Sequence, residues 1–259
     1  MKKIKYFLLS LLIVFSLSDY TFAQNELDSI LNQLLESFSQ LRPVLRQFSM
    51  LSDEDEMKYG DQIAEEFNKE VTIINYKTDK VRRIGEKMLS YVSRPAIQYK
   101  FRVIETDEVN AFAVAGGNIY VTKALLDFVE NDDQLAFVIG HEIGHVDLKH
   151  SSEMVETIVL AGTFGGSTGE MFAGIAYKIL STPFSKYQEY DADKAGAYFS
   201  YKANYEPRAS ISFFNKLSDY FGEDDTRRTS GTIDNIMRTH PYSKDRATRI
   251  KQYINDELK

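Results

Sequence analysis

The 259-residue sequence contains no cysteine, which excludes disulfide bridges, thiolate metal sites, a cysteine nucleophile and a lipidated N-terminal cysteine. Histidine is scarce too, with only His141, His145, His150 and His240. A bound metal ion must therefore be held by imidazoles and carboxylates. Basic side chains are outnumbered, 31 Lys and Arg against 38 Asp and Glu. The resulting charge of −7 argues against nucleic acid as a partner, because phosphate binding needs a basic surface.

The longest apolar run lies at the N-terminus, from Tyr6 to Leu17. Three lysines precede it among the first five residues, and polar residues follow it up to Ala23. This pattern predicts a secretory signal peptide over residues 1–23, cleaved near Ala23, and hence a periplasmic or secreted protein. The alternative is a retained membrane anchor, but twelve apolar residues form only about 18 Å of helix, too short for a ~30 Å hydrocarbon core.

Beyond the signal peptide, the hydrophobic pattern predicts one α+β domain over residues 24–259, predominantly helical with a small β-sheet. We expect a helical N-terminal part (24–95), a metal-binding core (96–200) and a helical C-terminal part (201–259). The glycine-rich apolar segment 158–180 is expected to form loops and short helices packed near the site. A peripheral membrane contact through this segment is the alternative.

Local patterns predict where two helices begin. The acidic stretch Ser52–Glu56 fits a first helical turn, where negative charge meets the positive end of the helix dipole. Asn131, with Gln134 three residues later, predicts the cap of a helix that runs to His150.

Two other stretches have the composition of strands. Residues 98–105 alternate in the manner of a strand, and residues 112–122 contain two short β-prone runs. Gly116 and Gly117 separate these two runs and predict a turn between them.

The strongest chemical signal is the motif HExxH at residues 141–145. His141 and His145 are four residues apart, so on a helix both imidazoles project from one face and can bind one cation. Glu142 can act as a general base toward a water on that cation. The alternative is a polar helix face with two incidental histidines. Val138 and Ile143 argue against it, because they indicate a buried helix, and buried polar side chains need partners.

Two histidines leave a catalytic zinc site incomplete, because such sites usually have three protein ligands and one water. The third ligand must be a carboxylate or another histidine. The segment Ser185–Gly196 (SKYQEYDADKAG) offers Glu189, Asp191 and Asp193 on a predicted helix. Spacing alone does not choose among these three. Without the HExxH motif, the segment would be interpreted as an exposed acidic helix face.

Four blocks of sequence resemble the zinc metallopeptidases of the CAAX-prenyl-endopeptidase and HtpX family, in particular their exported bacterial members without transmembrane helices. In chain order the blocks are Asn110–Leu126 (NAFAVAGGNIYVTKALL), His141–Ser151 (HEIGHVDLKHS), Ser185–Gly196 and Thr239–Ile250 (THPYSKDRATRI). The likeness extends from about Leu51 to Ile250. It implies a zincin-like fold, a gluzincin-type arrangement of two histidines and one glutamate, and one Zn²⁺ per chain.

The resemblance also assigns the acidic residues. Glu189 matches the family's third zinc ligand, and Asp193 matches the aspartate that orients the first histidine, here His141. The sequence departs from the family pattern at Lys186, where arginine is common, and at Asp191, where glutamate is common. Neither position is a ligand in the family.

A substrate site follows from the same resemblance. The stretch 116–122 resembles the family's edge strand above the zinc, to which an extended peptide adds as a further strand through backbone hydrogen bonds. The expected substrate contacts are Gly116, Gly117, Asn118, Ile119 and Tyr120. An ordinary sheet strand is the alternative.

His240 resembles a family histidine near the metal. There it would stabilise the oxyanion or occupy the open zinc position, with Arg246 as a supporting cation. From spacing alone, a histidine before proline is more often a surface or capping residue. His150 is interpreted as a partner of the helix dipole or a structural contact rather than a ligand.

These observations predict a zinc-dependent endopeptidase that hydrolyses extended or misfolded exported proteins in protein quality control. One alternative is a catalytically weak, chaperone-like protein that binds misfolded chains in the same cleft. Glu142 argues against it, because a pure binding protein needs no base beside the metal. A second alternative is a metal-dependent hydrolase of non-peptide substrates. The sequence makes no prediction of the oligomeric state.

Overall fold

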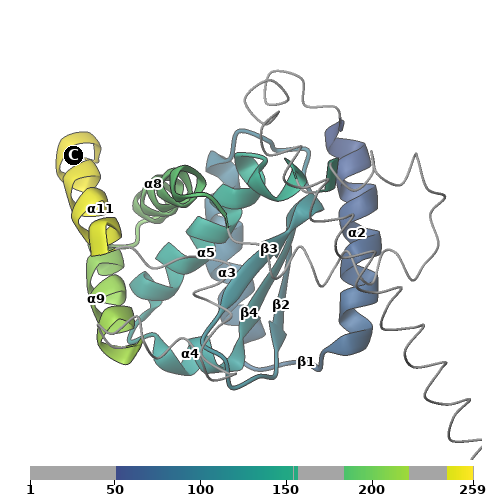
Figure 1. Cartoon of the computed structure of the whole chain (residues 1–259), viewed down its shortest axis with the longest axis horizontal. Helices are drawn as coiled ribbons and strands as arrows, with labels where there is room; N and C mark the ends of the chain where they lie inside the picture. Colours follow the sequence, from purple (N-terminus) through teal and green to yellow (C-terminus); the bar gives the residue numbers. More distant parts are fainter. Residues whose placement is uncertain (1–50, 154, 157–183, 222–243, 259) are drawn as a thin grey trace, which may run out of the picture. The chain divides into compact units, whose positions relative to one another are not determined.

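The computed structural model describes residues 51–153, 155–156, 184–221 and 244–258 (Figure 1). The chain divides into two compact units, residues 1–49 and 50–259, and all described residues belong to the second. The predicted signal peptide, the segment 158–180 and His240 lie outside the described residues. Signal-peptide cleavage and the internal domain boundaries therefore stay predictions.

The described residues confirm the α+β class, mostly helical with one small mixed sheet. In chain order the elements are α2 (Asp53–Glu70), β1 (Ile73–Ile74), α3 (Thr78–Met88), the 3₁₀ turn η1 (Leu89–Tyr91), β2 (Lys100–Ile104), β3 (Ala111–Val114), the 3₁₀ turn η2 (Ala115–Gly117), β4 (Asn118–Thr122), α4 (Lys123–Phe128), α5 (Asp132–Asp147), α8 (Lys186–Lys202), α9 (Ala209–Phe221) and α11 (Lys244–Glu257).

The strands follow the order β1-β2-β4-β3, so β4 lies inside the sheet. It pairs in parallel with β2, with Lys100 opposite Asn118, and antiparallel with β3, with Val114 opposite Asn118. The prediction that residues 116–122 form an edge strand is therefore wrong. The two-glycine turn makes β3 and β4 neighbours, as expected, but pairing with the more distant β2 covers the other side of β4. Among the described residues, β3 lies at the sheet edge instead.

Hydrophobic side chains pack on both faces of the sheet. Phe112 and Tyr120 point to one face, where they stack on each other and contact Phe67 of α2 edge-on. Ile119 and Val121 point to the other face and join the larger core with residues of α3, α5 and α9. Figure 1 accordingly shows α2 along one face of the sheet, and α3 and α5 on the other. All five residues of β4 are buried, the apolar Ile119 and Val121 as well as the polar Asn118 and Thr122 at its ends, because elements cover the strand on both faces.

Side-chain hydrogen bonds cap the N-termini of α2, α4, α5 and α8. The Ser52 hydroxyl accepts a hydrogen bond from the backbone N–H of Asp55 at the start of α2, which confirms the acidic first turn. Asn131 caps α5 in the same way, as predicted. Ser185 caps α8 in a reciprocal capping box with Gln188. This cap places Glu189 in the first turn of α8.

The HExxH helix ends earlier than predicted. Helix α5 stops at Asp147, and helical residues resume at His150. Between them, Lys149 has a left-handed backbone with φ of 64°. The chain therefore changes direction before His150, which does not continue the α5 axis.

No helix among the described residues has the length and apolarity needed to cross a membrane.

Candidate active site

Close packing of α5 against α8 builds the site. A Cβ at Gly140 would lie 3.0 Å from the Gly196 carbonyl oxygen, and one at Gly196 would lie 2.9 Å from the His141 nitrogen. A Cβ at Gly144 would meet the Ala195 methyl at 2.7 Å. No larger side chain fits these positions without moving one helix. The glycines therefore let the backbones approach until the first turns of α8 face the HExxH motif.

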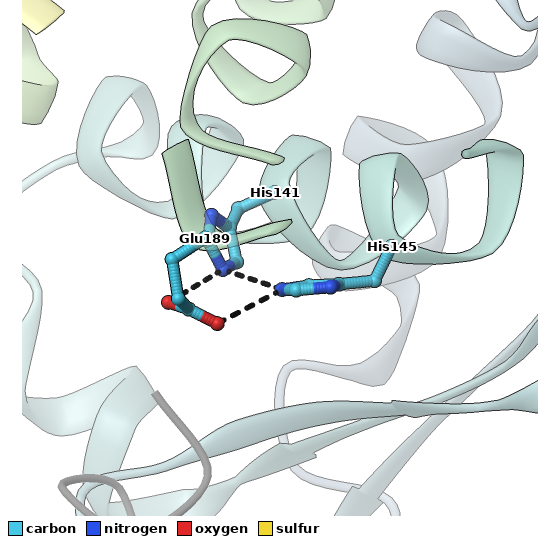
Figure 2. A group of neighbouring side chains, drawn as sticks. All are labelled: His141, His145 and Glu189. Atoms are coloured by element: carbon cyan, nitrogen blue, oxygen red, sulfur yellow. Dashed lines mark hydrogen bonds and ion pairs between the residues drawn. The ribbon is translucent and has the colours of Figure 1, made fainter. Parts of the chain in front are cut away.

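Figure 2 shows His141 and His145 of α5 and Glu189 of α8 pointing toward one another. The Nε2 atoms of the two histidines are 3.0 Å apart. The Glu189 carboxylate lies 3.7 Å from His141 Nε2 and 3.4 Å from His145 Nε2. All three side chains are buried. The structure thus brings together two histidines and one glutamate, the donor set that the family resemblance implied.

This group fits a zinc ion in chemistry and in size. Two histidines and one glutamate are a known ligand set of catalytic zinc. At zinc–ligand distances near 2.0–2.1 Å, tetrahedral neighbours lie about 3.3 Å apart. The three observed separations, 3.0, 3.4 and 3.7 Å, lie on either side of that value. A small shift of the side chains would therefore accommodate the ion.

Asp193 contacts the first histidine, and Arg246 contacts both Asp193 and Glu189. The Asp193 Oδ1 atom lies 3.0 Å from His141 Nδ1, the ring nitrogen opposite the metal-facing Nε2. Arg246 of α11 donates two hydrogen bonds to Asp193 and places its Nη1 atom 2.9 Å from Glu189 Oε2. A carboxylate at Nδ1 stabilises the tautomer that leaves Nε2 free for a metal. The position of Asp193 is the one that the resemblance implied.

The electrostatics of this pair favour its charged form. Burial alone would raise the pKa of Asp193, but the Arg246 guanidinium and His141 together lower it below its usual value. Burial acts to lower the pKa of Arg246, whereas Asp193 and Glu189 raise it, and the net shift is upward. Both side chains therefore stay ionised, and Asp193 remains a hydrogen-bond acceptor.

Glu142 is also buried and follows His141 on α5. Its charge contributes to the raised pKa of Arg246, so Arg246 experiences the field of Glu142, Glu189 and Asp193. In formal charge, three carboxylates and one guanidinium leave two negative charges in a buried space. A divalent cation neutralises that charge, which supports the fit of the group to zinc.

The second histidine has neighbours that the sequence analysis did not assign. The His150 Nδ1 atom lies 3.1 Å from His145 Nδ1. Phe184 stacks on the His145 ring, with centroids 3.9 Å apart and planes inclined by 22°. The sequence HEIGHVDLKH places His150 five residues after His145, but it did not indicate that a turn after α5 would bring His150 into contact with the His145 ring. Phe184 carries no sequence signal for such a contact.

A second buried network, also missed from the sequence, connects α2, η2 and the end of α5. Arg94 pairs with the fully buried Glu56 and donates to the Val146 carbonyl oxygen at 2.7 Å. Glu56 in turn accepts a hydrogen bond from the Gly116 backbone N–H at 3.2 Å. Asp147 accepts the backbone N–H of Arg94 at 2.9 Å. The network holds the turn before β4 against the HExxH helix.

The predicted substrate residues do not line an edge. Gly116 and Gly117 form the η2 turn with φ of 74° and 86°, and residues 118–120 are in the interior strand β4. The neighbouring strand β3 lies beside the segment that follows α5, because the Ser151 hydroxyl donates to the Ala113 carbonyl oxygen at 3.2 Å.

The mixed sheet, the HExxH helix and the glutamate on α8 together define a zincin-like metallopeptidase domain. The chain belongs to peptidase family M48, which it matches over residues 75–254. Members of this family are zinc-dependent metallopeptidases, in agreement with the donor set at the site.

Several curated proteins are similar to this chain. The beta-barrel assembly-enhancing protease of Escherichia coli is 28% identical over 229 residues, which cover 80% of this chain and 45% of that protein. The metalloprotease LoiP of the same organism is 27% identical over 219 residues, covering 79% of this chain and 82% of LoiP. The mitochondrial metalloendopeptidase OMA1 of Schizosaccharomyces pombe is 22% identical over 204 residues, covering 76% and 57%. The chain thus spans less than half of the first of these relatives.

Proposed function

We propose that this protein is a zinc-dependent endopeptidase that hydrolyses peptide bonds in extended or misfolded exported proteins, with one Zn²⁺ per chain. The observation that carries the proposal is the buried group of His141, His145 and Glu189, with Glu142 beside it on α5. Membership of a metallopeptidase family supports the reaction class.

Each side chain has a definite part in the proposed reaction. His141, His145 and Glu189 would hold the zinc ion, which would supply a Lewis acid for the scissile carbonyl and for the attacking water. Glu142 accepts a proton from the attacking water and passes it to the amine nitrogen as the C–N bond breaks. Arg246 holds Glu189 and Asp193 in place through the contacts described above.

We assign the proposed peptide site to β3 rather than to β4. An extended substrate needs a strand with backbone groups on an open side, and β4 uses both of its sides within the sheet. Strand β3 is at the edge of the described sheet and lies near the segment after α5. A peptide with N-methyl groups at alternate residues should then be cleaved more slowly than its unmethylated form. Equal rates would contradict strand-like binding.

The proposed location is outside the cytoplasm. The support is the N-terminal sequence, in which a basic segment, an apolar run and a small residue at Ala23 stand in the order of a signal peptide. The resemblance of the four sequence blocks to exported members of the CAAX-prenyl-endopeptidase and HtpX family implies the same location. The mature N-terminus, sequenced from protein secreted by a bacterial host, should be Gln24; a retained Met1 would contradict cleavage.

The experiment that tests the function is hydrolysis of an unfolded protein with and without a chelator. Purified protein should degrade β-casein, lose that activity in 1,10-phenanthroline, and regain it when zinc is restored. Activity that survives complete removal of the metal would contradict a zinc-dependent mechanism. Metal-loaded protein that binds β-casein without cleaving it would favour the chaperone-like alternative.

A further inference from the structure

His145 contacts His150 through Nδ1, the ring nitrogen opposite the Nε2 atom that faces His141 and Glu189. Their Nδ1 atoms are 3.1 Å apart, and both rings are buried. At that distance one nitrogen must carry a proton and the other a lone pair, because two N–H groups or two lone pairs would repel. The contact therefore requires that only one of the two Nδ1 atoms carries a proton, and it leaves two arrangements, with either histidine as the donor.

The other nitrogen of His145 decides which tautomer is required. His145 Nε2 lies 3.0 Å from His141 Nε2 and 3.4 Å from Glu189 Oε1. To bind a metal there, Nε2 must present its lone pair, so the proton of the neutral ring must reside on Nδ1. His145 is then the donor, and His150 Nδ1 is the acceptor.

The turn after α5 makes this contact. Residues five apart on one continuous helix are about 140° apart around its axis, so their side chains do not face each other. Helix α5 instead ends at Asp147, and the left-handed Lys149 redirects the chain so that His150 returns to His145. Phe184 stacks on the His145 ring and limits its rotation from one side.

The Nδ1 atoms of the two motif histidines thus contact different kinds of side chain. His141 faces the carboxylate of Asp193, which is itself paired with Arg246, whereas His145 faces a second imidazole. We propose that His150 is a positioning residue that accepts the Nδ1–H hydrogen bond of His145 and so holds Nε2 in the orientation that binds zinc. This inference rests on the proposed zinc site.

The test is the zinc dissociation constant of purified protein and three variants, measured at one pH by competition with a chromophoric chelator. His150→Ala removes the acceptor and leaves a space, and His150→Phe fills the space without an acceptor. His150→Asn places an amide oxygen on the γ carbon, as Nδ1 is in histidine. We expect His150→Ala and His150→Phe to weaken zinc binding roughly 10–100-fold and His150→Asn to restore most of it.

Two further measurements separate positioning from general packing. The urea midpoint of the metal-free proteins should be similar for His150→Phe and His150→Asn, although their zinc affinities differ. With Co²⁺ in place of zinc, the visible absorption of His150→Phe should shift, because the ligand field changes when His145 is misoriented, and His150→Asn should resemble the parent protein.

Three results of the zinc measurements would contradict a positioning role for His150. Unchanged zinc affinity in all three variants would show that His150 has no influence on the site. Equal loss in His150→Asn and His150→Phe would show that the acceptor atom is unimportant, and a second zinc ion that requires His150 would make it a ligand. Failure of the parent protein itself to bind zinc would overturn the proposed function, and with it this inference.

Discussion

The guanidinium group of Arg246 donates two hydrogen bonds to the carboxylate of Asp193, from Nε to Oδ2 at 2.9 Å and from Nη2 to Oδ1 at 2.6 Å. Asp193 in turn lies 3.0 Å from His141 Nδ1. A continuous chain of polar contacts therefore extends from α11, through α8, to the HExxH helix. Helix α11 is thus part of the site through Arg246, although the candidate metal ligands His141, His145 and Glu189 lie on α5 and α8.

The first prediction concerns Arg246. Arg246→Ala should lower the free energy of unfolding by about 3–5 kcal/mol, because it leaves the buried Asp193 and Glu189 carboxylates without their cation. Urea denaturation of the metal-free protein measures the change. Arg249→Ala is the matched control on the same helix, since Arg249 is exposed and lies over the Tyr190 ring. Equal effects of the two substitutions would argue against the buried pair.

The second prediction concerns Asp193. Asp193→Ala should weaken zinc binding roughly 10–100-fold, because His141 loses the acceptor that orients its ring. Asp191→Ala provides the control, since Asp191 is nearly half-exposed and pairs with Lys194 at 3.5 Å. A zinc titration compares the two variants. The same dissociation constant for both would remove Asp193 from the site.

The third prediction concerns the contact between α5 and α8. Gly196→Ala adds a methyl group that would lie 2.9 Å from the His141 nitrogen, so the helices must separate. We expect a loss of about 1–3 kcal/mol of stability together with weaker zinc binding. The control is Tyr187→Ala on the exposed side of α8, where the side chain is 77% exposed. Normal zinc affinity in the Gly196 variant would show that the ligands tolerate such a separation.

The fourth prediction concerns the third ligand. Glu189→Ala should leave only His141 and His145 and so reduce the zinc content of the purified protein well below one ion per chain. Elemental analysis after dialysis against a weak chelator measures this content. Full zinc occupancy in the variant would mean that another carboxylate completes the site.

The sequence predicted the local features of the site because they depend on short spacings. The motif at His141 and His145 needs only the helical repeat, and the cap at Asn131 needs only one hydrogen bond within four residues. The choice of Glu189 over its acidic neighbours came from a family resemblance. Spacing alone left Asp193 equally eligible.

Features that depend on contacts between distant segments were not predictable in this way. Strand β4 is interior because it pairs with β2, and alternation of side chains does not reveal which strands become neighbours. The contact of His150 depends on the left-handed Lys149, a conformation that lysine adopts only rarely. Arg246 was expected to support His240, but its contacts with Glu189 and Asp193 arise from the packing of α11 on α8.

The most direct test of the account is hydrolysis of β-casein by Glu142→Gln compared with the parent protein, with the zinc content of both determined. Glutamine keeps the shape of the side chain but cannot take up a proton from water. The account predicts the same zinc content in the two proteins and a loss of hydrolysis of at least about 10²-fold in the variant. Equal rates of hydrolysis at equal zinc content would contradict it.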